Sequence, residues 1–341
     1  MSSQPFISVI IPVRNESKFI ARTVEYLQIQ EYPEDRMEII VVDGQSDDNT
    51  REIVAKIARS DKRVKLFENP RRLSSAARNI GAEKARGDIV LYIDGHTYID
   101  NTQLLDNTAK LMTEKDVSVL SRPQFLETPD NDRFQRAVAL ARESAVGHGL
   151  DSTIYESREL YVNPASSAAA YTRAILDDLN GFDERFDAAE DYEFNYRVGK
   201  AGYRSFTSLK LAVYYYPRKS FGALFKQMAR YGIGRMRLAV KHPETFGLGT
   251  LIPVLFTLGL LLLPFLALLP PTARYAYAAL YGLYLALVLG SSLVISVRRG
   301  LAYLGYLPFI FPTIHLGLGF GFLREFVRTA LGRGLVRDKT D

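Results

Sequence analysis

The chain of 341 residues is 47% hydrophobic and 24% charged, and it contains no Cys and no Trp. This length allows one large domain or two ordinary ones. The absence of Cys excludes disulfide scaffolds, thiolate metal sites and Cys nucleophiles, and it fits a reducing compartment. The formal net charge of +5 suits nucleic acid, anionic lipid or phosphorylated substrates equally well, so it selects none of them.

The first 244 residues alternate short apolar runs with helical stretches. The predicted strands span residues 7–13, 38–43, 64–67 and 88–94. The predicted helices between them span about 17–30, 48–60 and 74–86. Apolar strands joined by helices indicate a mostly parallel α/β sheet that is covered on both faces. In such sheets ligands bind at the carboxyl ends of strands, so the loops starting at Pro12, Asp43 and Asp94 are expected to converge.

Two carboxylates, Asp43 and Asp94, each close an apolar strand. A lone Asp at a strand end is most simply a turn residue. Two Asp residues in equivalent positions at the ends of two strands instead favour a binding or catalytic site. A strand-end carboxylate that faces a diphosphate would hold a hard divalent cation. His96, two residues after Asp94, is a softer ligand that would favour Mn over Mg, and it is equally well explained as a capping or core residue.

A second acidic cluster, Glu190 and Asp191, starts a predicted helix within the sequence FDAAEDYEFNYR. The simplest explanation is that the helix dipole stabilises carboxylates at this end. An ionised carboxylate in a site is also what a general base for a hydroxyl group requires. The residue types alone leave both explanations open.

A nearly uncharged stretch, residues 245–323, follows and contains only three charged side chains, Arg274, Arg298 and Arg299. Its runs 245–273 and 275–297 are long enough to cross a hydrocarbon core, which predicts two transmembrane helices. In the third run, 300–323, Pro308 and Pro312 each remove a backbone donor and predict a broken helix.

The positions of the basic residues predict the orientation of this region. Arg298 and Arg299 follow the second run, and Arg324, Arg328, Arg333, Arg337 and Lys339 follow the third. Because basic segments stay in the cytoplasm, the third run is expected to be re-entrant and packed against protein. The polar start MSSQP predicts no cleavable signal peptide. The sequence therefore predicts a multi-pass protein of the cell inner membrane with its N-terminal part in the cytoplasm.

The segment just before the first run, residues 220–244, is predicted to be an amphipathic helix. At 100° per residue one stripe carries Lys226, Arg230, Arg237 and Lys241. The opposite side carries Phe221, Leu224, Phe225, Met228 and Met236. Such a helix suits anionic headgroups or a lipid-linked phosphate, and the alternative is an ordinary surface helix. The expected organisation is a cytoplasmic catalytic domain at 1–219, an interfacial helix at 220–244, a membrane region at 245–323 and a basic cytoplasmic tail at 324–341.

In this order and spacing, the segments VIIPVRNE, VVDGQSDD, ARNIGA, AEDYEFNYR and QMARYG resemble family-2 inverting glycosyltransferases of the GT-A fold. The resemblance extends more narrowly to membrane-anchored bacterial enzymes of succinoglycan-type exopolysaccharide synthesis. It implies a Rossmann-like catalytic domain with helices on both faces of the sheet, followed by an α-helical membrane region.

The resemblance also implies roles for individual residues. The donor nucleotide sugar would be bound by Pro12, Arg14, Glu16, Asp43, Arg78, Asn79 and Asp94. Asp94 matches the first Asp of the family's Asp-x-Asp metal motif, so Asp94 and His96 are the candidate metal ligands. Asp191, next to Glu190, matches the catalytic base. The acceptor and diphosphate would be contacted by Gln227, Arg230 and Tyr231.

Two departures from the family pattern change what it implies. His96 replaces the usual second Asp, which leaves the identity of the metal, Mg or Mn, open. Tyr231 replaces Trp, and few apolar runs follow it, which favours transfer of a single sugar over processive synthesis through a channel.

The activity implied is transfer from a UDP-sugar to a polyprenyl-linked or other lipid-linked glycan at the cytoplasmic face of the membrane. Membrane lipids are expected partners, and nucleic acid is disfavoured because the basic residues cluster beside the predicted spans. One alternative is a polyprenyl-phosphate sugar synthase, whose phosphate acceptor needs no strong base. Another is a non-catalytic, nucleotide-binding membrane component. The sequence leaves the oligomeric state open.

Overall fold

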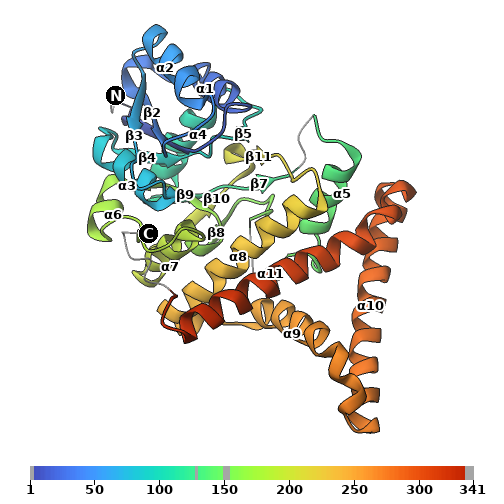
Figure 1. The fold of residues 1–341 in the computed structure, drawn as a ribbon. Helices are drawn as coiled ribbons and strands as arrows, with labels where there is room; N and C mark the ends of the chain where they lie inside the picture. Colours follow the sequence, from blue (N-terminus) through green and yellow to red (C-terminus); the bar gives the residue numbers. More distant parts are fainter. Residues whose placement is uncertain (1–3, 127–129, 149–153, 335–341) are drawn as a thin grey trace. The chain divides into compact units, whose positions relative to one another are not determined.

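The computed structural model describes residues 4–126, 130–148 and 154–334, and the chain divides into two compact units. The first, called here the α/β unit, comprises Met1–Thr128 and Thr153–Tyr216. The second, called the helical unit, comprises Pro129–Ser152 and Pro217–Asp341. Figure 1 labels the elements of both.

The α/β unit is built on an eight-stranded sheet with the order β3-β2-β1-β4-β9-β6-β10-β8. Its strands are β1 (Ile7–Val13), β2 (Met37–Asp43), β3 (Val64–Glu68), β4 (Ile89–Tyr92), β6 (Val119–Ser121), β8 (Leu160–Val162), β9 (Ala168–Thr172) and β10 (Ser205–Thr207). The pairs among β1 to β4 and the pair β6–β10 are parallel, whereas β9 and β8 pair antiparallel with their neighbours. A smaller sheet pairs β5 (Thr97–Tyr98), β11 (Val213–Tyr215) and β7 (Gln124–Phe125). The expected α/β fold is confirmed.

Helices cover both faces of the large sheet (Figure 1). One face packs against α1 (Ile20–Gln28), α2 (Thr50–Ser60) and α4 (Leu104–Glu114). The other packs against α3 (Ser74–Lys84), α6 (Arg173–Asp178) and α7 (Glu190–Lys200). Within β1, Val9 and Ile11 belong to the first core and Ile10 to the second. Burial on both faces explains why the strands read as continuous apolar runs.

The helical unit consists of α5 (Arg133–Arg142), α8 (Phe221–Lys241), α9 (Leu248–Leu262), α10 (Pro271–Arg299) and α11 (Leu307–Ala330). This division differs from the boundary expected at residue 219, because residues 129–152 group with the C-terminal part and the division falls after Tyr216. Ala137, Val138 and Ala141 of α5 pack in one core with residues of α8 and α11. The periodicity of α5 predicts a helix with an apolar face, but it does not predict which element that face contacts.

Short 3-10 helices complete the chain in both units. They are η1 (Glu34–Arg36), η2 (Pro164–Ser166), η3 (Leu209–Leu211), η4 (Pro243–Thr245), η5 (Leu263–Leu268) and η6 (Leu301–Gly305). The first predicted span is thus an α-helix only to Leu262 and continues as η5, where Pro264 occupies the first turn.

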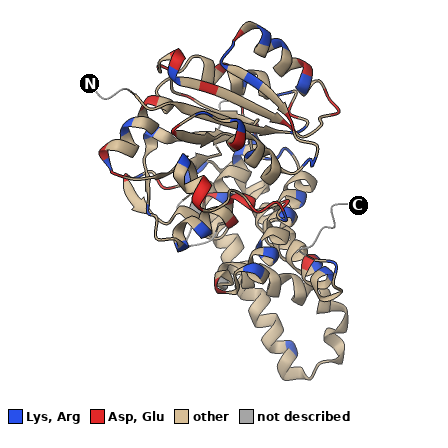
Figure 2. Ribbon diagram, turned by 90° about the vertical axis from the view of Figure 1, so that its left-hand side faces the viewer, with Lys and Arg blue, Asp and Glu red and all other residues tan. Residues whose placement is uncertain are grey.

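Three helices in the described part of the chain are long and apolar enough to cross a membrane: Gly249–Leu268, Pro271–Arg299 and Leu307–Ala330. The first two are barely covered by protein, with 17% and 11% of their apolar windows buried. In Figure 2 the hairpin that they form is almost free of charged residues. Both features are typical of helices that face lipid.

The third apolar segment differs from the expectation of a broken helix, because α11 is continuous from Leu307 to Ala330. Pro308 lies in the first turn, where a backbone N–H has no intrahelical partner to lose, and Pro312 removes one bond just beyond it. Arg324 and Arg328 belong to this helix rather than to a separate tail. Arg337 and Lys339 lie outside the described residues.

The predicted amphipathic segment is the helix α8, and Ser220 caps its N-terminus by accepting a hydrogen bond from the Ala223 N–H. One residue of the predicted cationic stripe lies inside the protein. Arg237 is buried and its Nε lies 2.8 Å from Glu325 Oε1 of α11. A partner 88 residues away in the sequence explains why helical periodicity alone placed Arg237 on the solvated side.

Candidate active site

The carboxyl ends of β1, β2 and β4 lie at one edge of the large sheet, because the three strands are neighbours and parallel. Val13 is paired in register with Asp43, and the Gly44 N–H donates to the Val13 carbonyl over 2.8 Å. Asp43 is buried and accepts hydrogen bonds from the backbone N–H and the hydroxyl of Ser46. The expected convergence of these loops is therefore observed.

The loop after β1 is held against the loop after β2. Asn15 has a positive φ of 60°, and its side-chain oxygen accepts a hydrogen bond from the Asp47 N–H over 3.0 Å. Pro12 is half-buried at the end of β1, and Arg14 is exposed. The Glu16 Oε1 lies 3.0 Å from the His96 Nδ1, so this loop also reaches the loop after β4.

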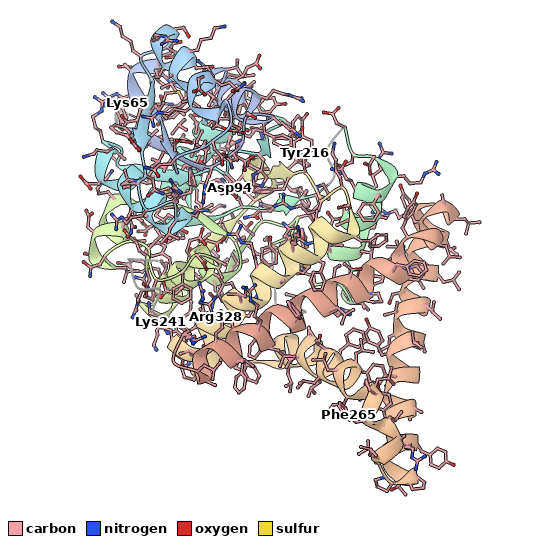
Figure 3. The ribbon with its side chains drawn as sticks, viewed as in Figure 1. Lys65, Asp94, Tyr216, Lys241, Phe265 and Arg328 are labelled. Atoms are coloured by element: carbon pink, nitrogen blue, oxygen red, sulfur yellow. The ribbon has the colours of Figure 1, made fainter. Side chains whose placement is uncertain are left out.

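Asp94 lies at the centre of the polar cluster, and Figure 3 labels it. One carboxylate oxygen accepts from Arg78 Nη2 over 3.1 Å, and the other accepts from the Tyr215 hydroxyl over 2.9 Å. The Asp94 side chain keeps 33% of its surface exposed. Desolvation raises its pKa, but Arg78, His96 and the Tyr215 hydroxyl outweigh this and hold the pKa below the ordinary value. Asp94 is thus kept ionised while it remains accessible.

Arg78 links Asp94 to the start of α7. Its guanidinium lies over the rings of Tyr92 and Phe182, at 5.4 and 5.5 Å from their centroids, and its Nε is 3.5 Å from Glu190 Oε1. Cation–π contacts and two carboxylates compensate for burial of the positive charge. Desolvation opposes that charge, yet the neighbouring carboxylates raise the pKa of Arg78 further above its ordinary range.

The acidic pair at the N-terminus of α7 combines a buried and an accessible carboxylate. Glu190 is buried, whereas Asp191 reaches solvent. Desolvation by the dense surrounding protein and the nearby Glu190 raise the pKa of Asp191 to about 6, against the opposing effect of Arg78. A carboxylate with a pKa near neutrality that can exchange protons with water has the properties of a general base.

Asn79 does not direct its amide to the centre of the cluster. Its Nδ2 donates to the Phe182 carbonyl over 2.8 Å, and its Oδ1 accepts from the Phe182 N–H over 2.8 Å. Gly181 has a φ of +60° and packs against the same amide, so a side chain there would meet both strain and the Asn79 oxygen. Asn79 therefore holds the loop that leads into α7, and its role in donor binding stays a prediction.

Two further residues of the cluster, Arg122 and Tyr215, were missed by the sequence analysis. Arg122 is only 4% exposed, and its Nη2 donates to the Tyr215 hydroxyl over 3.3 Å. Its Nε and Nη1 have no hydrogen-bond partner among the described residues. Arg122 follows β6 as Asp94 follows the strand β4, and a polar residue after an apolar run was the available signal. The three-residue length of β6 made that signal too short to recognise.

A divalent cation would find few protein ligands at this edge of the sheet. Within residues 4–126, 130–148 and 154–334 no three His, Asp or Glu side chains form a group that could hold a metal by themselves. Asp94 is ionised and accessible, and His96 approaches Glu16. These residues fit a cation such as Mg²⁺ or Mn²⁺ that takes one or two protein ligands and completes its shell with substrate phosphates.

The predicted acceptor motif lies on α8 in the helical unit. Gln227 and Tyr231 are one turn apart, and the Gln227 Nε2 donates to the Tyr231 hydroxyl over 3.3 Å. The Arg142 guanidinium of α5 lies 5.7 Å from the centroid of the Tyr231 ring. Arg230 is exposed. The motif is thus supported by α5, a contact that the sequence pattern of α8 did not predict.

The α/β unit has a GT-A-like fold, and its class, glycosyltransferase, follows from the family to which the chain belongs. Residues 8–179 match the family model described as glycosyl transferase family 2, and the chain belongs to this family. It is 32% identical over 289 residues to the "Succinoglycan biosynthesis protein ExoA" of Rhizobium meliloti, covering 82% of this chain and 85% of that protein.

Other relatives come from different organisms. The chain is 26% identical over 293 residues to a dolichyl N-acetyl-alpha-D-glucosaminyl phosphate glycosyltransferase of Methanococcus voltae, covering 83% of this chain and 91% of that protein. Among solved structures, the mannosyltransferase PcManGT of Pyrobaculum calidifontis, in complex with GDP-Man and Mn²⁺, matches with a TM-score of 0.60 at 21% identity. That match covers 97% of this chain and 89% of PcManGT. At this identity the match supports the fold.

Proposed function

We propose that this glycosyltransferase moves a single sugar, with inversion, from a UDP-sugar to a lipid-linked saccharide at the cytoplasmic face of the inner membrane. The observation that carries the proposal is a cluster of charged side chains together with the raised pKa of Asp191. The cluster joins Asp94 after β4, Arg78 of α3, and Glu190 and Asp191 at the start of α7. Asp191, with a raised pKa, suits a general base, whereas Asp94, with a lowered pKa, stays ionised. Two carboxylates whose environments shift their pKa values in opposite directions can take different roles in one site.

Asp191 acts as the general base in this proposal. It takes the proton of an acceptor hydroxyl, whose oxygen attacks the anomeric carbon on the face opposite the nucleotide. The new C–O bond forms as the bond to the diphosphate oxygen breaks, and UDP leaves with that electron pair. One base suffices because charge stabilisation of the leaving diphosphate replaces a general acid.

The remaining site residues bind and orient the donor. Asp43 and the loop with Pro12, Arg14 and Glu16 would hold the nucleoside, and Arg78 would face the diphosphate. A divalent cation held by Asp94, with His96 as a candidate second ligand, would neutralise phosphate charge. Arg122, through Tyr215, holds the Asp94 carboxylate in place.

The lipid-linked acceptor is proposed from the apolar helices and from the relatives. The names of two similar proteins specify succinoglycan biosynthesis and a dolichyl-linked substrate, which supports a glycan acceptor carried on a lipid. Gln227, Arg230 and Tyr231 of α8 would contact that acceptor and its diphosphate. Tyr231, in place of Trp, supports transfer of one sugar rather than processive synthesis.

The test replaces Asp191 with Asn in the full-length protein. Transfer should fall by about 10²–10⁴-fold with donor binding retained, because a general base contributes about that factor. Asp178→Asn, an exposed carboxylate on α6, is the matched control and should leave the rate unchanged. The wild-type rate should also decline as the pH falls through about 6, where Asp191 takes up a proton.

Other results would favour the competing functions. Near wild-type turnover of Asp191→Asn, with a lipid phosphate as acceptor, would identify a polyprenyl-phosphate sugar synthase, since a phosphate needs no strong base. Nucleotide-sugar binding without transfer or donor hydrolysis by the wild-type protein would identify a non-catalytic binding component.

A further inference from the structure

The helices α8 and α11 lie side by side and run in the same direction (Figure 1). Met228 packs against Gly317, Gly232 against Leu318, and further along the pair Met236 joins Phe322 in one core. Arg237 and Glu325 close the series with their ion pair, 2.8 Å between Nε and Oε1. The two helices are therefore joined along most of the length of α8.

Glycines allow this pairing at backbone distance. A Cβ added at Gly232 would overlap the Leu318 carbonyl oxygen, and one added at Gly321 would overlap the Ala229 carbonyl oxygen. Small residues at a helix interface permit such close approach, which fixes the relative direction of the two axes. The inclination of α11 to a membrane is consequently set by that of α8.

The charge pattern of α8 prevents it from spanning a bilayer. Lys226 and Arg230 are exposed on the side opposite Met228, and Arg235, Arg237 and Lys241 follow within the same helix. Each charged side chain at the centre of a hydrocarbon core costs at least about 2.5–3.5 kcal/mol. A helix that carries five cations within 21 residues lies instead at the headgroup level.

One exposed stripe along α11, continued by Leu331 just after it, is apolar, and the exposed Arg324 lies at its margin. Phe309, Phe320, Val327 and Leu331 are between 46% and 66% exposed. At 100° per residue these four positions fall within about 40° of one another. Half of the apolar window of α11 is buried within the protein, against 17% and 11% for the other two apolar helices. Only one stripe of α11 is thus available to lipid, unlike the nearly bare α10.

We propose that α11 lies in the plane of the membrane interface, with its apolar stripe in the acyl boundary and α8 on the headgroup side, so that both ends of α11 stay on one side of the membrane. The partner is a phospholipid surface. α11 then supports α8 and holds Gln227, Arg230 and Tyr231 at the depth of lipid phosphates. The proposal rests on the membrane association proposed above, and not on sugar transfer.

The chain has no Cys, so single Cys residues give site-specific labels. Nitroxides would be attached at Phe309, Phe320, Val327 and Leu331 in the full-length protein, reconstituted in phosphatidylcholine–phosphatidylglycerol vesicles. Relative accessibility to oxygen and to a water-soluble nickel chelate reports depth. All four labels should lie at a similar, shallow depth. Phe309, Val327 and Leu331 are more than half exposed, so the fold should tolerate labels there, whereas Phe320 also contacts the Phe225 ring.

A matched series on α10, at Tyr275, Leu280, Leu287 and Val297, serves as the spanning control. Its depth should increase towards the middle of the helix and decrease again. The same V-shaped profile on α11 would overturn the proposal while leaving membrane association intact. Water exposure throughout the α10 series would overturn membrane association and this proposal together. Neither result would contradict the proposed sugar transfer, which is measured separately.

A second measurement uses a membrane-impermeant maleimide on sealed vesicles. Arg299→Cys and Arg333→Cys, before and after α11, should react from the same side, and Arg274→Cys, between α9 and α10, from the other. Reaction of Arg299→Cys and Arg333→Cys from opposite sides would show that α11 crosses the bilayer.

Discussion

Two buried arginines, each paired with a carboxylate, distinguish the two units of this protein. In the α/β unit Arg78 contacts Asp94, whose side chain keeps 33% of its surface exposed. In the helical unit Arg237 contacts Glu325, and both side chains are almost fully buried, at 8% and 1% exposed. A pair that remains open to solvent can bind a substrate, whereas a closed pair can only join the helices that carry it. Whether such a pair binds substrate or only joins helices therefore depends on how accessible its carboxylate is, and not on the presence of the ion pair.

The largest expected effect lies in the closed pair. Glu325→Leu should lower the free energy of unfolding by about 3–5 kcal/mol, because it leaves the Arg237 charge buried without its carboxylate. Denaturant unfolding in detergent measures the change. The double variant Arg237→Met with Glu325→Leu should recover most of the loss, since two apolar side chains of similar volume replace both charges. A double variant as unstable as the single one would contradict the structural assignment.

The open pair should respond in activity, because its Asp94 carboxylate is accessible to substrate. Arg78→Met is expected to reduce transfer by on the order of 10²-fold, as removal of one donor to a developing negative charge does. Because Arg78 also lowers the pKa of Asp191, its loss should move the acid limb of the pH–rate profile to higher pH. Arg78→Lys, which keeps the charge, should move that limb less. An unchanged acid limb in Arg78→Met would show that Arg78 does not affect the pKa of the general base.

The glycine contact between α8 and α11 predicts a smaller loss of stability. Gly321→Leu should destabilise the protein by about 1–3 kcal/mol, because the new side chain would overlap the Ala229 carbonyl. Gly222→Leu is the matched control on α8, where a Cβ meets nothing within 4 Å. Thermal unfolding in detergent should separate the two variants. Equal melting temperatures would mean that the helices are not packed at backbone distance.

The smallest effect is expected at Tyr215. Tyr215→Phe removes the hydroxyl that donates to Asp94 and accepts from Arg122. Because a hydrogen bond contributes about 1 kcal/mol, transfer should become roughly fivefold slower. Tyr161→Phe, which loses a hydrogen bond to the Lys115 carbonyl at the sheet edge, is the control and should leave the rate unchanged. Initial rates at saturating donor compare the two variants, and equal rates would exclude Tyr215 from positioning Asp94.

Much of the site could be predicted because its residues occupy positions with local signatures. Asp43 and Asp94 follow apolar strands, and Glu190 and Asp191 start a helix, so periodicity alone locates them. Tyr215 could not be found in this way, since it lies 121 residues from Asp94 and in a strand of only three residues. The tie of Asn79 to the loop at Phe182 is equally long-range.

The sequence by itself determined the division into a charged α/β part and an apolar helical part, the α/β fold and the acidic strand ends. Charge, hydropathy and periodicity are local properties, which is why they could be read without coordinates. Only the tertiary structure decided that α5 belongs to the helical unit, that Arg122 and Tyr215 support Asp94, and that α11 packs along α8. Each of these depends on which distant surfaces meet, and a contact between glycine and backbone leaves no hydrophobic pattern in the sequence.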